Sequence, residues 1–159
     1  MRRLRFLLDA NVLLAVPIGH TVRQFGVATS YLVNDQVLNS AVFERLQQAT
    51  ASQPAVLAEL CRDYVIEARS TLTHLQEAID QSDPVKLRER AHYLKGSSMM
   101  LGAQDLSQAC AVLERMGRDN NLAEAASALR DTAVALKEVE IELAKIVGPA
   151  VLPAEGSAA

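Results

Sequence analysis

Apolar residues recur at intervals of three and four along most of the chain, which is the spacing of one face of an α-helix. One long run begins at Pro54 and another at Pro84, and these are the only prolines between residues 27 and 147. Proline and glycine interrupt helices, so their scarcity here favours long ones. The pattern therefore predicts an almost wholly helical chain from residue 38 to 147, where no strand pattern competes.

Polar capping residues, prolines and glycines divide this region into five predicted helices. In chain order, the boundary residues are Asn39 or Ser40, Pro54, Asp83 with Pro84, Gly102, Gly117, and Asn120 or Asn121. Gly102 and Gly117 are the expected ends of the third and fourth helices. The predicted helices cover about residues 40–49, 54–80, 85–101, 104–116 and 121–147.

The connections between these helices are only about two to six residues long, so successive helices must pack as antiparallel neighbours. The predicted fold is all-α: an up-and-down antiparallel four-helix bundle with an additional short N-terminal helix. This bundle takes residues 38–147. Residues 1–37 are expected to form an N-terminal extension of unknown role, and residues 148–159 a flexible tail.

The first residues mimic a signal peptide, because basic residues 1–5 precede an apolar stretch from Phe6 to Ile18. Asp9 and Asn11 interrupt that stretch, and it is too short to cross a membrane. We therefore expect a cytoplasmic protein without membrane attachment, whose first segment is an extra amphipathic element. Export, and a start codon upstream of the physiological one, are the alternatives.

The last predicted helix carries leucines at strict seven-residue spacing, namely Leu122, Leu129, Leu136 and Leu143. A leucine zipper uses this spacing, and so does the buried seam of an antiparallel bundle. Glu140 interrupts one flank of the seam, which favours the bundle. The expected state is a monomer, and sedimentation of the protein as a monomer would exclude the zipper.

Composition and charge narrow the possible partners. The formal net charge is -3 and only 4% of residues are aromatic, without any Trp, so a nucleic-acid surface is disfavoured. Cys61 and Cys110 lie far apart, and neither belongs to a Cys/His cluster. They are expected to be buried thiols in a reducing compartment, and no metal site is predicted.

The residue with the clearest chemistry is His92 in the third predicted helix. On a helical wheel it points away from the apolar face, in the middle of the helix, with Arg88, Lys95, Gly96 and Met99 as its surface neighbours. An exposed neutral imidazole keeps a lone pair that can attack phosphorus. Lys95 could meet the added negative charge, and Gly96 would leave room for a partner.

The string around this histidine resembles the signature of histidine-containing phosphotransfer (HPt) proteins. The matching residues are Ala91-His92-Tyr93-Leu94-Lys95-Gly96-Ser97-Ser98-Met99-Met100-Leu101-Gly102-Ala103. The resemblance extends over roughly residues 37–147, through Tyr64-Val65-Ile66-Glu67 and Asp83 upstream and Leu106, Cys110, Leu113-Glu114 and Gly117 downstream.

The resemblance implies a helical bundle and a phosphorelay intermediate. His92 would be the phosphoacceptor, Lys95 would stabilise the phosphoryl group, Gly96 would clear space, and Arg88 and Met99 could contact partners. The phosphoryl group would come from a receiver-domain aspartate, fed by a hybrid sensor histidine kinase, and pass to another receiver aspartate. The chain itself would bring no cofactor, because the receiver supplies Mg²⁺, and it has no Gly-rich ATP-binding loop.

Two other functions use the same histidine. The dimerisation domain of a sensor kinase is one, although its usual His-Glu-x-x-Thr-Pro pattern is missing. A helical adaptor that docks receivers without transfer is the other. Across from the histidine the family often has Gln, whereas alignment of the second helix offers Glu67; we predict that Glu67 is a surface residue outside the site. Met99 and Met100 could dock partners or fill the core.

Overall fold

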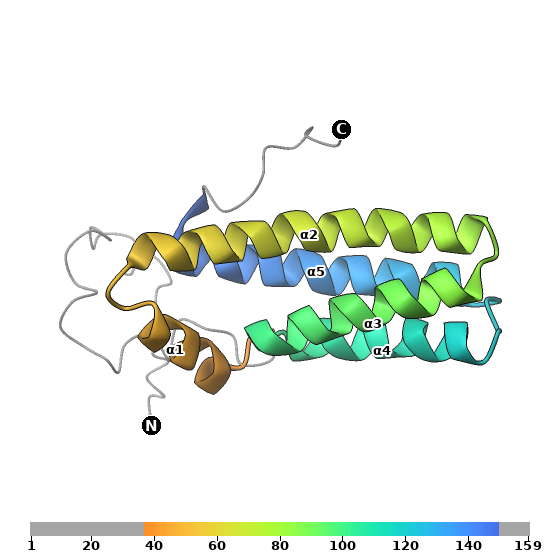
Figure 1. Ribbon diagram of the computed structural model, residues 1–159, viewed down its shortest axis with the longest axis horizontal. Helices are drawn as coiled ribbons and strands as arrows, with labels where there is room; N and C mark the ends of the chain where they lie inside the picture. Colours follow the sequence, from red (N-terminus) through yellow and green to blue (C-terminus); the bar gives the residue numbers. More distant parts are fainter. Residues whose placement is uncertain (1–36, 150–159) are drawn as a thin grey trace, which may run out of the picture.

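The computed structural model describes residues 37–149, and these form five helices joined by short turns (Figure 1). The helices are α1 (Ser40–Ala49), α2 (Pro54–Asp80), α3 (Pro84–Leu101), α4 (Gln104–Arg118) and α5 (Ala125–Val147). The predictions for the N-terminal extension and the C-terminal tail lie outside the described residues, apart from residue 37 and residues 148–149. Within the described part, no helix has the length and apolar character needed to cross a membrane.

The four long helices form two layers, with α2 and α5 in one and α3 and α4 in the other (Figure 1). Each long helix contacts two others, in the cyclic order α2, α3, α4, α5. The short α1 lies at the end of the bundle where α3 stops and α2 begins, and it contacts both of them. The predicted all-α bundle with an additional short helix is therefore confirmed.

Capping explains where the first and third helices begin. The side chain of Asn39 accepts a hydrogen bond from the Val42 N–H at 3.1 Å, and that of Asp83 accepts one from the Lys86 N–H at 3.0 Å. Each bond satisfies an amide that has no partner inside its helix. Gly102 ends α3 with φ of +88°, a conformation that favours glycine.

The predicted end of the fourth helix is wrong in one respect, because Gly117 lies inside α4 and the helix continues to Arg118. Gly117 does not stop the helix but lets it approach α3. A Cβ atom at this position would lie 2.6 Å from the Pro84 carbonyl oxygen and 2.7 Å from the Arg88 nitrogen. The absent side chain is thus used for packing, which the sequence pattern alone does not distinguish from a helix end.

The last helix begins later than predicted, at Ala125. Asn121 does not cap it, because its side chain accepts a hydrogen bond from the Ala123 N–H at 3.3 Å, within the preceding turn. Asn120 has a φ of +51° and also belongs to this turn. The two asparagines therefore shape the connection between α4 and α5, a role that asparagine fills in many turns.

The leucines of α5 face the interior of the bundle. Leu129, Leu136 and Leu143 are buried, together with leucines from α2, α3 and α4. They are therefore unavailable to a zipper between two copies of the chain, and the zipper hypothesis is wrong. Cys61 and Cys110 are buried and unpaired, as predicted. Burial raises the pKa of the Cys61 thiol to about 11 and that of Cys110 to about 12.

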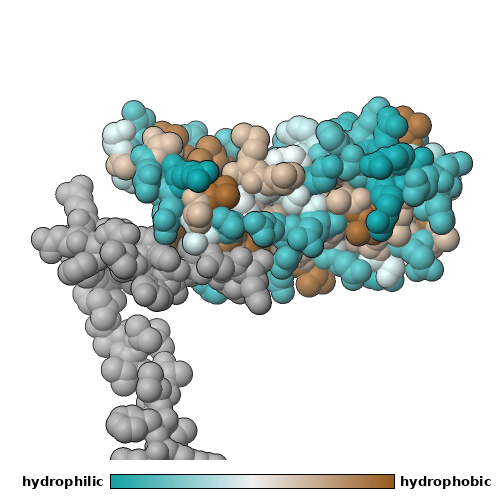
Figure 2. Space-filling model, turned by 90° about the horizontal axis from the view of Figure 1, so that it is seen from below, coloured by the Kyte–Doolittle hydropathy of each residue, from teal (hydrophilic) through white to brown (hydrophobic). Residues whose placement is uncertain are grey.

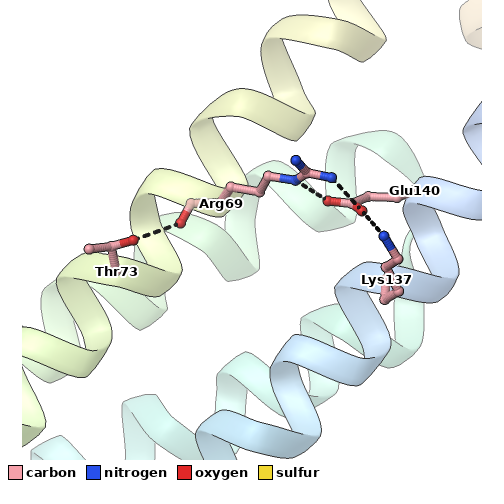
Figure 3. A network of polar contacts seen from close by, with 4 residues as sticks. All are labelled: Arg69, Thr73, Lys137 and Glu140. Carbon is pink, nitrogen blue, oxygen red and sulfur yellow. Dashed lines mark hydrogen bonds and ion pairs between the residues drawn. The ribbon is translucent and has the colours of Figure 1, made fainter. Parts of the chain in front are cut away.

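A charged cluster joins α2 to α5 across the outer side of the bundle (Figure 3). Arg69 donates two hydrogen bonds to the carboxylate of Glu140, from Nε at 2.6 Å and from Nη2 at 2.9 Å. Lys137 lies 3.4 Å from the same carboxylate, and the Glu140 side chain is only 3% exposed. The glutamate that interrupts the apolar flank of α5 is therefore paired by a bidentate contact, which fixes the relative position of the two helices.

Candidate functional site

His92 lies in the middle of α3 and 67% of its side chain is exposed. The opposite face of the helix packs into the core through Leu87, Ala91 and Leu94, all of which are buried. The helical period therefore directs the imidazole away from the core, as the wheel predicts. An imidazole held here can reach a group on another protein without any rearrangement of the bundle.

The imidazole is oriented by a carboxylate from the neighbouring helix. His92 Nδ1 lies 2.9 Å from Oε1 of Glu114 on α4, whose side chain is only 11% exposed. A carboxylate can only accept hydrogen bonds, so Nδ1 carries the proton and donates it. In the neutral ring the other nitrogen, Nε2, then keeps the lone pair that is available for chemistry.

Glu114 also binds cations. Lys95 Nζ donates to its Oε2 at 2.5 Å, and Arg118 Nη2 lies 3.8 Å from its Oε1. The hydrogen bonds from Lys95 and then from His92 hold the pKa of Glu114 below its ordinary value, because they stabilise the charged form. One ionised carboxylate thus joins the histidine and the lysine.

The other residues predicted from the sequence lie around this group. Arg88, Glu89, His92 and Glu114 line a surface depression. A Cβ atom at Gly96 would meet nothing within 4 Å, so this glycine serves no packing contact within the described part of the chain.

The two methionines do not fill the core. Met99 and Met100 are exposed, as is Tyr93 one or two turns earlier on the same helix. We call these three residues the exposed apolar residues of α3. Seen from the side of α3 and α4, the surface is largely hydrophilic, with apolar side chains scattered among polar ones (Figure 2). The core-packing interpretation of the methionines is therefore wrong.

Beneath the exposed face, a polar contact ties α3 to α2. The hydroxyl of Tyr64 lies 2.9 Å from that of Ser98, and Ser98 donates to the Leu94 carbonyl at 2.7 Å. Since the Ser98 proton is used there, Tyr64 is the donor in the contact between the two hydroxyls. This bond joins α3 to α2 one turn beyond Lys95.

The sequence reasoning missed Glu114 as a site residue. Glu67 is exposed on α2, as predicted, and the residue that contacts His92 comes from α4 instead. The sequence offered one indication of this role, which is the position of Glu114 on its helix. Glu114 follows buried Cys110 and Leu113 and precedes buried Gly117, so it lies on the buried face. A carboxylate there needs a partner, because burying an unpaired charge is costly.

The chain is similar to proteins of known family and fold. The family model described as Hpt domain matches residues 59–147. Multistep phosphorelay regulator 1 of Schizosaccharomyces pombe is 28% identical over 88 residues, which are 54% of this chain and 30% of that protein. The chain therefore corresponds to less than a third of this relative's length.

Solved structures share the fold. Histidine-containing phosphotransfer protein B (HptB) from Pseudomonas aeruginosa PAO1 is 25% identical, with a TM-score of 0.66 over 72% of this chain and 96% of that one. The yeast protein Ypd1p is 18% identical, with a TM-score of 0.69 over 76% of this chain and 99% of that one. At 18% identity the second likeness concerns the fold alone.

Proposed function

This chain belongs to the Hpt domain family, and we propose from that premise that His92 carries a phosphoryl group between receiver domains of a phosphorelay. The observation that carries the proposal is the contact of His92 Nδ1 with Glu114, since in the neutral ring it leaves the lone pair on Nε2 of an exposed side chain. A nucleophile for phosphorus needs that lone pair, and it needs access to the donor.

In the proposed first transfer, Nε2 attacks the phosphorus of an aspartyl phosphate. The N–P bond forms as the P–O bond to the aspartate breaks, and the aspartate departs as a carboxylate. The ring then carries a positive charge with its proton still on Nδ1, and the ionised Glu114 beside that proton stabilises it. In the second transfer, the aspartate of another receiver attacks the same phosphorus and the neutral imidazole leaves.

Lys95 and Gly96 are proposed to assist from one turn further along α3. The ammonium of Lys95 is close enough to share Glu114 with His92, so it can also meet the charge of a phosphoryl group on Nε2. Gly96 presents open space beside them. A receiver backbone could approach the histidine there without meeting a side chain.

The proposed partners are receiver domains. A hybrid sensor histidine kinase would supply the phosphoryl group to the first of them. A receiver has an acidic phosphorylation pocket that holds Mg²⁺, and Arg88 and Arg118 next to His92 offer complementary charge. Among the exposed apolar residues of α3, the methionines supply adaptable contacts. Because transfer requires release, we expect a small interface, near or below about 1,200 Å².

The test is transfer of labelled phosphate from a phosphorylated receiver, with ATP removed. Wild type should take label that is lost in acid, as expected for phosphohistidine, and His92→Gln should take none. His74→Gln is the matched control: this half-buried histidine lies on α2, so its replacement should leave transfer unchanged. Full transfer by His92→Gln would refute the assignment.

The same experiment decides between transfer and docking alone. If phosphorylated receivers bind the wild-type protein and none of them transfers label, the chain acts as an adaptor. The melting temperature of His92→Gln should stay near that of wild type, since the side chain lies outside the core. Loss of label in a variant that still melts normally therefore reports on chemistry and not on folding.

A further inference from the structure

α4 packs tightly against the start of α3 at a glycine. A Cβ atom added to Gly117 would lie 2.6 Å from the carbonyl oxygen of Pro84, 2.7 Å from the nitrogen of Arg88 and 2.9 Å from its Cβ. Two of these atoms belong to the backbone of the first five residues of α3, which cannot move aside as a flexible side chain can. The spacing of the two helices at this level therefore requires a residue without a side chain.

The site lies one helical turn away from this contact. Going along α3, Arg88 is followed four residues later by His92, and going back along α4, Gly117 is preceded three residues earlier by Glu114. The Gly117–Arg88 contact and the Glu114–His92 hydrogen bond are thus successive contacts of the same antiparallel pair. Whatever sets the spacing at the first contact also sets the distance that Glu114 has to bridge at the second.

Toward its start, the buried face of α4 carries further small residues beside Leu106 and Leu113. Cys110 and Ser107 are buried on the face of α4 that carries Gly117, and Ala103 precedes them at the N-cap. Such residues keep two helices close together. Glu114 stands between Cys110 and Gly117 as a long polar side chain, and it reaches the exposed side of α3 because its neighbours on both sides are small.

We propose that Gly117 is a positioning residue for the phosphoacceptor: it holds α4 at the spacing from which Glu114 reaches His92 Nδ1. This inference rests on the proposed function of His92, and it adds a residue that touches neither the histidine nor a partner. It also assigns a second use to the glycine, whose position in the last turn of α4 would otherwise be explained by packing alone.

The first test is Gly117→Ala, with Gly102→Ala as the matched control at the other end of the same helical hairpin. Gly102 has a φ of +88°, so alanine there is strained and lowers the melting temperature without touching the Gly117 contact. Nitrogen NMR of the unphosphorylated protein reports which nitrogen of His92 carries the proton. For Gly117→Ala we expect the two ring nitrogens to become more alike, as both tautomers are populated, and the transfer rate to fall about 10-fold.

The control separates positioning from stability. Gly102→Ala should keep the wild-type imidazole spectrum and transfer rate at temperatures where it is folded. A Gly117→Ala protein with the wild-type spectrum and rate would overturn the inference. An equal change in both variants would overturn it as well, since general destabilisation would then explain the effect.

A second variant covers the case in which Gly117→Ala does not fold. Glu114→Asp leaves the packing at Gly117 intact and withdraws the carboxylate by one methylene, so it should reproduce the loss of the fixed tautomer and the slower transfer. If it retains the wild-type spectrum and rate, the reach of residue 114 is unimportant and the inference fails. If wild type itself takes no label, the proposed function fails, and the spectrum still decides whether Gly117 positions the histidine.

Discussion

Two buried glutamates in this bundle each join neighbouring helices, and they do so with different partners. Glu140 on α5 receives Arg69 from α2 and Lys137 from its own helix (Figure 3). Glu114 on α4 receives His92 and Lys95 from α3. Both carboxylates are paired with basic side chains, and both link helices that are adjacent in the bundle.

The partners decide what each cluster can do. Arginine and lysine have donors only, so the cluster around Glu140 can hold helices together but offers no lone pair to a substrate. Imidazole has two nitrogens, and when the Nδ1–H donates its hydrogen bond to Glu114, the lone pair of Nε2 in the neutral ring is left available on the exposed side chain. The same kind of contact is therefore structural in one layer and able to serve chemistry in the other.

Replacing each of the two glutamates by alanine, in separate variants, should give the largest difference in transfer rate. Glu114→Ala releases the imidazole and should slow phosphotransfer by up to about 100-fold, since orientation of the reacting group is lost. Glu140→Ala should leave transfer unchanged and cost about 1 to 3 kcal/mol of stability, because the contacts of Arg69 and Lys137 with this carboxylate are lost. The cost stays below that of a fully buried pair, since the Arg69 side chain is 32% exposed and can reach water.

The two measurements are the phosphotransfer rate of each variant and its free energy of unfolding in denaturant. The comparison breaks down if Glu140→Ala slows transfer as much as Glu114→Ala does at equal fraction folded. It also breaks down if Glu114→Ala transfers normally, because orientation by the carboxylate would then have no function.

The glycine in the exposed face of α3 should give the next largest effect. Gly96→Gln places a long side chain beside His92 and should lower transfer roughly 10-fold, equivalent to about 1.4 kcal/mol of lost complementarity with the receiver. The isolated protein should become more stable by about 0.5 to 1 kcal/mol, because glycine is a poor helix former and no described atom opposes the new Cβ. Normal transfer together with that gain in stability would contradict the clearance role.

Replacing the lysines of the two clusters should produce a smaller difference in transfer rate. Lys95→Ala should slow transfer or shorten the lifetime of the phosphorylated protein by about 5-fold at most, the range expected for one partly exposed ion pair. Lys137→Ala is the matched control, because this lysine also contacts a buried glutamate but lies on another layer of the bundle. Equal effects of the two substitutions on transfer would remove Lys95 from the mechanism.

Local signals made most of the fold predictable. Asn39, Asp83 and Gly102 each act within one turn of their own helix, so the sequence contains the whole reason for the boundary. His92 was predictable as an exposed residue for the same reason, since its direction depends only on the period of α3. The start of α5 was missed because Asn121 can bond equally well within a turn or at a cap.

Contacts between helices could not be predicted in this way. Whether Glu114 or Glu67 meets His92 depends on the register of α4 and α2 against α3, and neither register is encoded in the period of a single helix. Gly117 has the same character: a glycine near the end of a helix is a stop signal locally, and only the backbone of α3 beside it makes it a packing position. The roles of Glu114 and Gly117 could therefore be identified only from the structure, at the contacts between two helices.

The smallest expected effect is the pH dependence of stability at Glu114. Hydrogen bonds from Lys95 and then from His92 keep the pKa of this carboxyl in the folded protein below its ordinary value of 4.5. A lowered pKa means that the contribution to stability is complete above the ordinary value and is lost as the pH falls through the folded value. The free energy of unfolding of wild type relative to Glu114→Gln should thus be constant from neutral pH to about pH 5 and should decline below about pH 4. Denaturant unfolding of the two proteins across this range makes the measurement, and a difference that does not vary with pH would show that the carboxylate charge at the site contributes nothing to folding.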